Sequence, residues 1–227
     1  MNYIVFDMEW NQPRTKEEMI KEPIRLCGEV IQIGAVKADE NGNVLDTLEI
    51  MIHPVYYTKM HAKVRKLTGI DNEAIKEGIP FNEAYERFMN FCGDDFCFMT
   101  WGNDDIGIIL SNMKIHGIST DDFPVCYNLQ RIYGKQIAKT KNQVSLEDAI
   151  EALEEPSYLA HNALNDAVSA ARVLKHLDIE REKLELSKQK QSAASAEGKK
   201  RRPRRRRRRG ADKKKAIEPA ASVGAGE

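Results

Sequence analysis

The fold is decided near the start of the chain, where residues 2–10 read Asn-Tyr-Ile-Val-Phe-Asp-Met-Glu-Trp. Tyr3 to Phe6 form a continuous apolar run, which is typical of a strand that is buried on both faces. Asp7 and Glu9 follow at positions i and i+2, so their side chains leave such a strand on the same side. Two carboxylates at a buried strand end repel each other and lose hydration, and a divalent cation relieves both costs. The alternative is that the strand ends before Asp7 and leaves both acids in water.

The rest of the first 186 residues alternates between strand and helix patterns. Asn41-Gly42 separates two β-rich runs, which predicts a hairpin, and Ser145 with Asp148 resembles a capping box at a helix start. We expect strands at residues 2–8, 30–37, 44–52 and 96–100, and helices at residues 61–67, 81–91, 104–115, 145–153 and 163–186. Strands that come first, followed by helices that alternate with one more strand, predict an α/β fold in which helices cover a mixed sheet.

The chain of 227 residues has room for one domain and an appendage. No apolar run approaches the ~18 residues that a membrane span needs, and the first ten residues lack the basic flank of a signal peptide. The chain has four cysteines, and they have neither Cys-x-x-Cys spacing nor a histidine cluster beside them. This pattern argues against structural zinc. Free thiols without a secretory signal are typical of a reducing compartment, so we expect a cytoplasmic protein without membrane contact. Nothing in the sequence indicates the oligomeric state. The cysteines are Cys27, Cys92, Cys97 and Cys126.

Charge is distributed unevenly along the chain. Residues 188–227 hold fifteen basic and four acidic side chains, a net charge of +11, so the rest of the chain carries −11. No apolar periodicity follows Leu186, and residues 187–227 cannot bury enough apolar area to offset their ordering entropy. We therefore expect a domain at residues 1–186 and a disordered polybasic tail after it. We interpret the basic run at residues 201–209 as a nucleic-acid tether, because the acidic body repels its own substrate; a localisation signal is the alternative.

Two acids follow the strand expected at residues 96–100. Asn103 fits an N-cap there, which places Asp104 and Asp105 in the first helical turn, where the helix dipole favours acids. Asp105 is in line with Ile109 at i+4, so it points towards the sheet and Asp104 points away. Asp105 is therefore the functional candidate of the pair.

His161 and Asp166 form the last candidate site. A spacing of five does not place two residues on one helix face, so we expect His161 in the loop before a helix and Asp166 in its first turns. Asp166 then heads the stripe that continues at Ala170 and Val173, and it faces inwards. The alternative for a lone histidine is a structural role.

Together these positions supply four acids and one titratable base. Four carboxylates that converge on one sheet edge are very costly without a metal, and hard oxygen ligands suit Mg²⁺ or Mn²⁺. Two such ions clamp a phosphodiester, because one activates water and the other steadies the leaving oxygen. A neutral histidine can take the proton from that water. The set predicts metal-dependent hydrolysis of a phosphodiester.

The order Asp-x-Glu, then Asp, then His-x4-Asp resembles the DnaQ-like 3′–5′ exonucleases of the DEDDh type, and among them the group of KapD and the ERI-type exoribonucleases. The resemblance covers residues 2–177, and its motifs are highly specific as an ordered set. They are residues 3–12, Leu67-Thr-Gly-Ile70, Trp101-Gly102 before Asp105, and His161-Asn-Ala-Leu-Asn-Asp-Ala167.

The resemblance implies an RNase H-like fold, which is a five-stranded mixed sheet flanked by helices. Four strands are clear in the sequence, so a fifth is expected at residues 123–127 or 157–160. The second range is the better candidate because it directly precedes His161. The resemblance also implies His161 as general base and two Mg²⁺ or Mn²⁺ ions on four ligands. These ligands are Asp7, Glu9, Asp105 and Asp166.

The implied activity is release of nucleoside 5′-monophosphates from the 3′ end of single-stranded nucleic acid, with RNA favoured over DNA. Thr68-Gly69-Ile70 resembles the family loop that wedges at the terminal base, and a glycine helix stop is the alternative. Met8 and Trp10 flank the acids and are expected to touch the terminal nucleotide, with core packing as the alternative for Met8. Two rival functions are a catalytically idle exonuclease-like module that binds nucleic acid, and an adaptor whose tail alone binds RNA.

Overall fold

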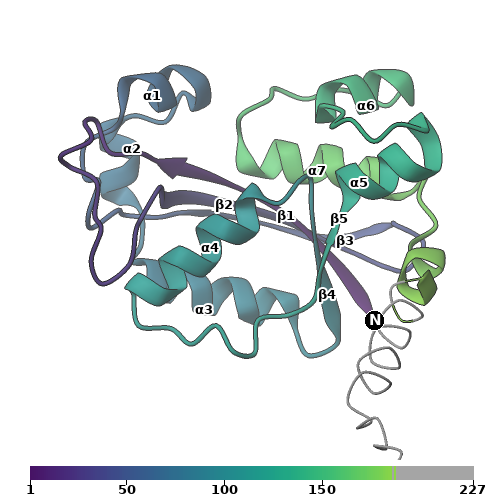
Figure 1. Cartoon of the computed structure of the whole chain (residues 1–227), viewed down its shortest axis with the longest axis horizontal. Coiled ribbons are helices and arrows are strands. Elements are labelled where there is room, and N and C mark those ends of the chain that lie inside the picture. Colours follow the sequence, from purple (N-terminus) through teal and green to yellow (C-terminus); the bar gives the residue numbers. More distant parts are fainter. Residues whose placement is uncertain (186, 188–227) are drawn as a thin grey trace, which may run out of the picture. The chain divides into compact units, whose positions relative to one another are not determined.

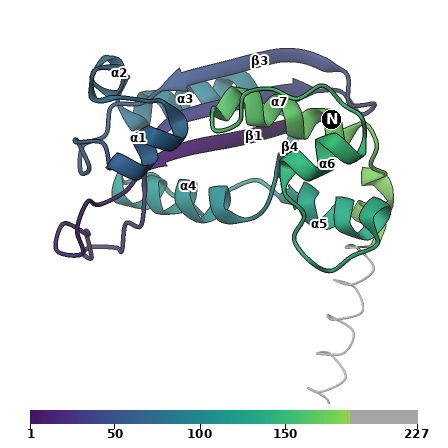
Figure 2. The same ribbon diagram turned by 90° about the horizontal axis from the view of Figure 1, so that it is seen from above.

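The central strand of the computed structural model is β1 (Asn2–Asn11). It pairs antiparallel with β2 (Glu29–Ala38) and parallel with β4 (Phe96–Thr100). β3 (Val44–Met51) extends the sheet beyond β2, and β5 (Cys126–Asn128) extends it beyond β4, so the order is β3-β2-β1-β4-β5. This five-stranded mixed sheet with helices around it (Figure 1 and Figure 2) confirms the expected RNase H-like α/β fold.

Helices cover both faces of the sheet. They are α1 (Ala62–Thr68), α2 (Asn72–Glu77), α3 (Phe81–Cys92), α4 (Asp104–Ile115), α5 (Leu129–Tyr133), the π-helix η1 (Gly134–Ala138), α6 (Leu146–Ala152) and α7 (Ala163–Leu174). Along β1, Ile4, Phe6 and Met8 pack against α3 and α4, whereas Tyr3 and Val5 pack against α5 and α7. Figure 1 shows α3 and α4 below the strands and α6 and α7 above them. Within the described residues, no helix combines the length and the apolar character that crossing a membrane requires.

The expected hairpin and the expected helix cap are both present. The Asp39 carboxylate accepts hydrogen bonds from the backbone of Asn41 and Asn43, which closes the turn between β2 and β3. The Ser145 hydroxyl accepts a hydrogen bond from the backbone N–H of Asp148 over 3.0 Å, so it caps α6. These turns could be predicted because each depends on side chains within four residues of one another.

The fifth strand is not where the sequence favoured it. Residues 157–160 were the better candidate, and that prediction is wrong, because Cys126–Asn128 forms β5 beside β4 and overlaps the other candidate range. Residues 157–160 have no strand partner, and Leu159 is 84% exposed. The edge of β4 is taken by β5, and the segment before His161 is a loop.

The expected long helix at residues 163–186 is also interrupted. α7 ends at Leu174, and the next amides bond to carbonyls three residues back, which tightens the last turn. The amide of Asp178 then donates to the Gln136 side chain over 2.8 Å, so it leaves the helical ladder. Residues 179–185 are helical again. The sequence missed this break because it depends on a partner forty-two residues away.

The structure describes residues 1–185 and 187, and residues 1–179 form one compact unit. The predicted polybasic tail lies outside the described residues, apart from Ser187. The domain boundary expected at residue 186 therefore stays a prediction.

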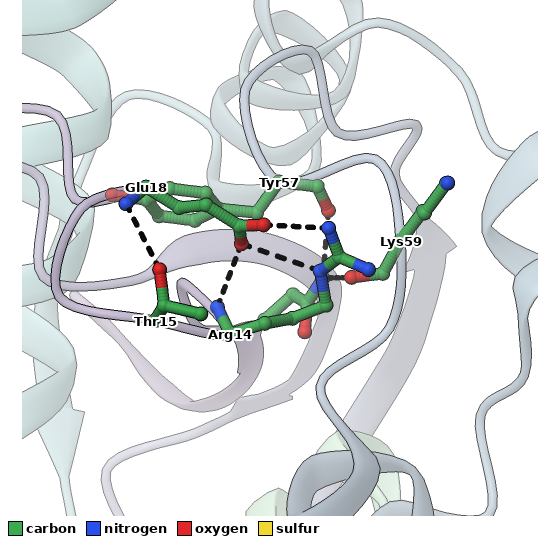
Figure 3. Close-up of polar contacts among 6 residues, drawn as sticks. Arg14, Thr15, Glu18, Tyr57 and Lys59 are labelled. Carbon is green, nitrogen blue, oxygen red and sulfur yellow. Dashed lines mark hydrogen bonds and ion pairs between the residues drawn. The ribbon is translucent and has the colours of Figure 1, made fainter.

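The loop between β1 and β2 is fixed at the far end of the sheet. Figure 3 shows Arg14 donating to the carboxylate of Glu18, whose own amide donates to the Thr15 hydroxyl. At the start of this loop, the side-chain amide of Asn11 donates to the backbone carbonyl oxygens of Tyr57 and Lys59 over 2.6 and 2.9 Å. The two Asn11 contacts tie the last residue of β1, the strand that carries Asp7 and Glu9, to residues 57–59.

Candidate active site

The site begins where β1 runs past the end of its neighbour. The pairing of β1 with β4 extends only to Val5 opposite Met99, so the β4 side of the next residues is open. The amide of Met8 is taken instead by the carboxylate of Asp105 in the first turn of α4, over 3.1 Å. Because strand side chains alternate, Asp7 and Glu9 both lie on the α7 face. The two acids share one face of the strand as expected, but β1 continues to Asn11, so they lie within the strand and not at its end; the alternative that the strand ends before Asp7 is wrong.

The start of α7 lies directly on β2 opposite Asp7. Asp7 pairs with Gly34 in the sheet, and a Cβ on Gly34 would overlap the backbone of Ala163 and Leu164. Only glycine allows this close approach. The amide of Ala163 donates to the buried side chain of Gln32 over 3.1 Å, which fixes the first turn of the helix. This contact brings the N-terminal end of α7 to the carboxylates of β1.

His161 lies in the loop before α7, and Asp166 lies in the first turn of that helix, as expected. His161 has a φ of 63°, a left-handed conformation that is uncommon for residues other than glycine. Its amide donates to the Asp166 carboxylate over 3.0 Å. One side-chain ligand atom from each of His161, Asp166 and Glu9 lies within 4.8 Å of the other two. Residues distant in the sequence therefore meet as a group that is suited to hold a metal ion.

A cavity of about 280 Å³ joins these elements. Eight of the ten predicted site residues line it: Asp7, Met8, Glu9, Trp10, Thr68, Asp105, His161 and Asp166. Gly69 and Ile70 do not. Gly69 ends α1 with a φ of 75°, and Ile70 is buried in a core cluster with Ile31 and Val64, so the helix-stop interpretation fits these two residues. Met8 belongs to the core as well as to the cavity wall.

Besides the predicted Thr68, two residues that the sequence did not single out, Val64 and Leu67, line the α1 side of this cavity. Val64, Leu67 and Thr68 occupy i, i+3 and i+4 of α1 and present one face to it. Leu67 is 50% exposed, so part of its apolar surface is open to the cavity and to solvent. The spacing was visible in the sequence, but its direction depends on how α1 packs. Gln12, Trp101 and Asp104 also line the cavity.

A second cavity of about 400 Å³ opens from the same acids on the side of α6. Asp7, Trp101, His161 and Asp166 border both cavities. The other walls of the second cavity come from the start of α6, from the loop at residues 157–160 and from Ser169 of α7. The acids therefore lie between two open spaces, one beneath α1 and one beside α6.

Burial raises the pKa values of the clustered carboxylates. The pKa of Asp7 lies well above its usual range, first because the side chain is desolvated and then because Asp105, Asp166 and Glu9 repel its charge. Desolvation, with repulsion from Asp166 and Asp105, raises the pKa of Glu9 to about 7. Desolvation also raises the pKa of Asp105 to about 7. The pKa of Asp166 is raised by burial, although the hydrogen bond from His161 opposes the shift.

This donor set fits divalent metal ions. Among the described residues that line the 280 Å³ cavity, five are acids and none is a lysine or arginine. The carboxylates therefore have no lysine or arginine in the cavity wall to offset their mutual repulsion. A hard divalent cation supplies that charge and takes oxygen ligands. The chemistry of the residues is consistent with Mg²⁺ or Mn²⁺.

Fold and site together define a class of protein. A β3-β2-β1-β4-β5 mixed sheet, with acids from β1, α4 and α7 around one opening, is the arrangement of the DnaQ-like nucleases in the RNase H-like superfamily. The sequence model of the Exonuclease (RNase_T) family matches residues 4–174, and the chain belongs to this family. DEDDh exonucleases depend on divalent metal ions.

Curated relatives agree with this assignment. The chain is 22% identical over 187 residues to the probable 3′–5′ exonuclease KapD of Bacillus subtilis, which covers 82% of this chain and 88% of that protein. It is 26% identical over 145 residues to the PolC-type DNA polymerase III of Caldanaerobacter subterraneus subsp. tengcongensis. That match covers 64% of this chain but only 10% of the polymerase, so the chain corresponds to a small part of it.

Solved structures show the same fold. The nuclease domain of 3′hExo, a DEDDh family member bound to rAMP, superposes with a TM-score of 0.67 at 17% identity, over 77% of this chain and 90% of that one. Cell-death related nuclease 4 superposes with a TM-score of 0.65 at 21% identity, over 77% and 62% of the two chains. Exonuclease I of E. coli in complex with a dT13 oligonucleotide gives a TM-score of 0.59 at 15% identity, over 77% and 40%.

Proposed function

We propose that this protein is a metal-dependent exonuclease that removes nucleoside 5′-monophosphates from the 3′ end of a single strand, with RNA favoured over DNA. One observation carries the proposal: four carboxylates and a histidine from distant segments meet at one open cavity in a chain of the Exonuclease family. The 3′–5′ polarity is supported by the likeness to KapD. The residues concerned are Asp7, Glu9, Asp105, Asp166 and His161.

The carboxylates are proposed to hold two Mg²⁺ or Mn²⁺ ions, which supply positive charge to the scissile phosphate and acidify water. His161 is proposed as the general base, because a ring nitrogen lies within 4.8 Å of carboxylate oxygens of Glu9 and Asp166. That nitrogen takes the proton of the attacking water. Attack on phosphorus breaks its bond to the 3′ oxygen of the preceding nucleotide, and this oxygen takes up a proton from solvent water. The products are a nucleoside 5′-monophosphate and a strand with a new 3′-hydroxyl group.

The terminal nucleotide is proposed to occupy the 280 Å³ cavity. Trp10 and Thr68 line it together with the half-exposed Leu67, and these side chains offer an apolar surface to the base. Solved relatives are described with rAMP, with a histone mRNA stem-loop and with single-stranded DNA, so the fold accommodates both sugars. The preference for RNA requires a protein contact to the 2′-hydroxyl group.

The polybasic segment at residues 188–227 is proposed to tether the same substrate. Its net charge of +11 contrasts with −11 for the rest of the chain, and this segment lies outside the described residues. Deleting it is expected to weaken apparent affinity most at low salt and to leave turnover at saturating substrate nearly unchanged. If log affinity falls with log salt at the same slope for the full-length and the truncated protein, the tail does not bind the nucleic acid.

The proposed function is tested with matched RNA and DNA strands that carry a label at the 5′ end. We expect a ladder that shortens from the 3′ end, faster for RNA, with mononucleotide products that carry a 5′ phosphate. Strands that end in a 3′ phosphate and circular strands should resist digestion. Cleavage of the circles would make the protein an endonuclease. Tight binding without cleavage in Mg²⁺ and in Mn²⁺ would favour the idle module instead.

A further inference from the structure

A third cavity, of about 620 Å³, lies on the surface formed by α5, η1 and the loop that follows them. Here it is called the amide–lysine cavity. Its described lining contains four exposed cations and no acid, although residues 1–187 carry a net charge of −11. The remaining lining residues are amides, a glycine and a threonine. The lining consists of Asn103, Asn128, Gln130, Arg131, Gly134, Lys135, Lys139, Thr140, Lys141, Asn142 and Gln143.

The amide–lysine cavity shares a wall with the 280 Å³ and 400 Å³ cavities that border the acids, which are called the catalytic cavities from here on. The indole N–H of Trp101 and the side-chain amide of Gln130 both donate to the carbonyl oxygen of Val144, over 3.2 and 2.8 Å. Trp101 borders both catalytic cavities, whereas Gln130 borders the amide–lysine cavity. On the neighbouring stretch of chain, Asn103 lines the amide–lysine cavity and Asp105 lines the 280 Å³ cavity.

The backbone holds this surface in a defined shape. Lys139 ends the π-helix η1 with a φ of 52°, and its ammonium group donates to the Gln136 carbonyl oxygen over 2.6 Å. The backbone N–H of Asn142 donates to the Thr140 hydroxyl over 3.1 Å, which folds the loop at residues 139–143. The side chain of Asn128 donates to Asn103 over 2.9 Å and joins β5 to the segment before α4. Short π-helices are frequent at functional sites.

We propose that the amide–lysine cavity binds the strand upstream of the scissile bond, through its phosphodiester groups and base edges. This inference rests on the proposed function and extends it. Lysine and arginine bind phosphates, and side-chain amides can pair with the edges of unstacked bases. The position fits the path of a strand, because α1 stands above the arrowhead of β1 while α5 and α6 stand to its right, back along the strand (Figure 1). A terminal nucleotide beneath α1 directs the upstream nucleotides past Trp101 towards Lys139 and Lys141.

The test compares the full-length protein with its Lys139→Gln/Lys141→Gln variant. Both lysines are exposed, and glutamine keeps a similar length, so the fold should be retained. The matched control is Lys114→Gln/Lys175→Gln, because these exposed lysines lie at the far ends of α4 and α7 from the acids. All three proteins carry the same basic tail. Binding of a labelled octanucleotide is measured in EDTA, where no cleavage occurs, so the result does not depend on catalysis.

We expect the Lys139/Lys141 variant to bind more weakly than the other two proteins, with a shallower salt dependence. Each lost contact to a single strand removes about 0.7 from the slope of log affinity against log salt, so two contacts remove about 1.4. The ratio of the octanucleotide affinity of the unchanged protein to that of the variant should then fall about sevenfold when salt rises fourfold. Cleavage of a dinucleotide in Mg²⁺ should be equal in all three, because a dinucleotide does not reach the cavity.

Two results would overturn the inference. One is the same affinity and salt slope for the variant and its control. The other is an equal loss of cleavage for dinucleotide and octanucleotide, which would place the lysines at the reaction itself. Failure of the proposed function gives a different pattern, in which the unchanged protein cleaves neither substrate. The octanucleotide binding measurements would still decide the role of the cavity in that case.

Discussion

The residues of the proposed active site lie in two regions that are held in different ways. Asp7 and Glu9 belong to a paired strand, and Asp105 is fixed to that strand through the amide of Met8; these three form the strand half of the site. His161 and the loop at residues 155–162 form the loop half. The loop half is exposed and has no sheet or helix ladder of its own.

Side-chain contacts hold the loop half instead. Arg172 of α7 donates to the carbonyl oxygen of Pro156 over 2.6 Å and stacks on the ring of Tyr158 at 4.5 Å. Asn165 donates to the carbonyl oxygen of Leu159 over 3.0 Å. The strand half is thus built into the core, whereas the position of the proposed base depends on a few exposed contacts. Changes in the strand half should alter chemistry and stability together, and changes in the loop half should alter chemistry alone.

The largest expected effect comes from Asp105→Asn in the strand half. Loss of this carboxylate, which is proposed to hold metal, should reduce cleavage by about 10³-fold or more, because metal ions supply several kcal/mol of transition-state stabilisation. The metal-free variant should melt above the unchanged protein, since the change removes a buried, repelled carboxylate. Asp104→Asn is the matched control, because Asp104 is exposed in the same helical turn and should matter far less. Equal losses for the two variants would remove the distinction between these acids.

His161→Ala tests the loop half. Loss of a general base should lower the rate about 10²–10⁴-fold, with metal binding and melting temperature largely kept. Cleavage rates, with Mn²⁺ binding measured in parallel, provide the check. An unchanged rate would assign His161 a structural role.

The pH dependence of stability should separate the halves in metal-free protein. The pKa values of Glu9 and Asp105 are about 7 in the folded state, against about 4 in an unfolded chain. The folded protein therefore binds more protons than the unfolded chain between about pH 4 and about pH 7, so stability should fall as pH rises through this window. The pKa values of Asp39 and Asp71 are lowered, so their stabilising effect is lost only at more acidic pH.

This prediction is measured as melting temperature against pH in EDTA. The decrease in melting temperature with rising pH should be smaller in Glu9→Gln. Mg²⁺ should suppress this decrease in the unchanged protein, because the ion stabilises the charged carboxylates. His161→Ala should show the same fall as the unchanged protein. A melting temperature that rises steadily from pH 5 to about pH 7 in EDTA would contradict the raised pKa values.

The smallest expected effect comes from Arg172→Ala, which releases the loop half. Exposed hydrogen bonds contribute about 0.5–1.5 kcal/mol each, so kcat should fall by up to about tenfold while KM and metal affinity change little. Arg172→Lys should recover only part of the loss, because lysine lacks the planar group that stacks on Tyr158. Arg87→Ala removes a comparable exposed pair on α3 and serves as the control. A rise in KM without a change in kcat would show that Arg172 acts on substrate binding.

The same contrast explains what the sequence could predict. The strand half follows from local rules: a buried run, an i, i+2 pair and an inward position on a helix are visible in residues 2–10 and 104–109. The location of His161 before α7 also follows from its spacing to Asp166. The structure brings these residues together, and their catalytic roles remain predictions.

What the sequence could not give depends on distant partners. The fifth strand is three residues long and exists because β4 offers it an edge, so its own propensity says little. The approach of α7 to β2 requires a glycine at position 34. The sequence does not show this requirement, because it depends on the backbone of Ala163, which faces Gly34 only in the folded protein. Leu67 enters the cavity wall only because α1 packs in one orientation. Tertiary contacts of this kind override local preference.

The central claim is that both halves of the site act as one metal-dependent centre, and restoration of activity by metal tests it most directly. Full-length protein is freed of metal with EDTA and then supplied with Mg²⁺ or Mn²⁺, beside Asp7→Asn from the strand half and Asp166→Asn from the first turn of α7, which directly follows the loop half. We expect no cleavage of a single strand without metal, recovery in the unchanged protein and no recovery in either variant. Full cleavage in EDTA, or full recovery in both variants, would contradict the account.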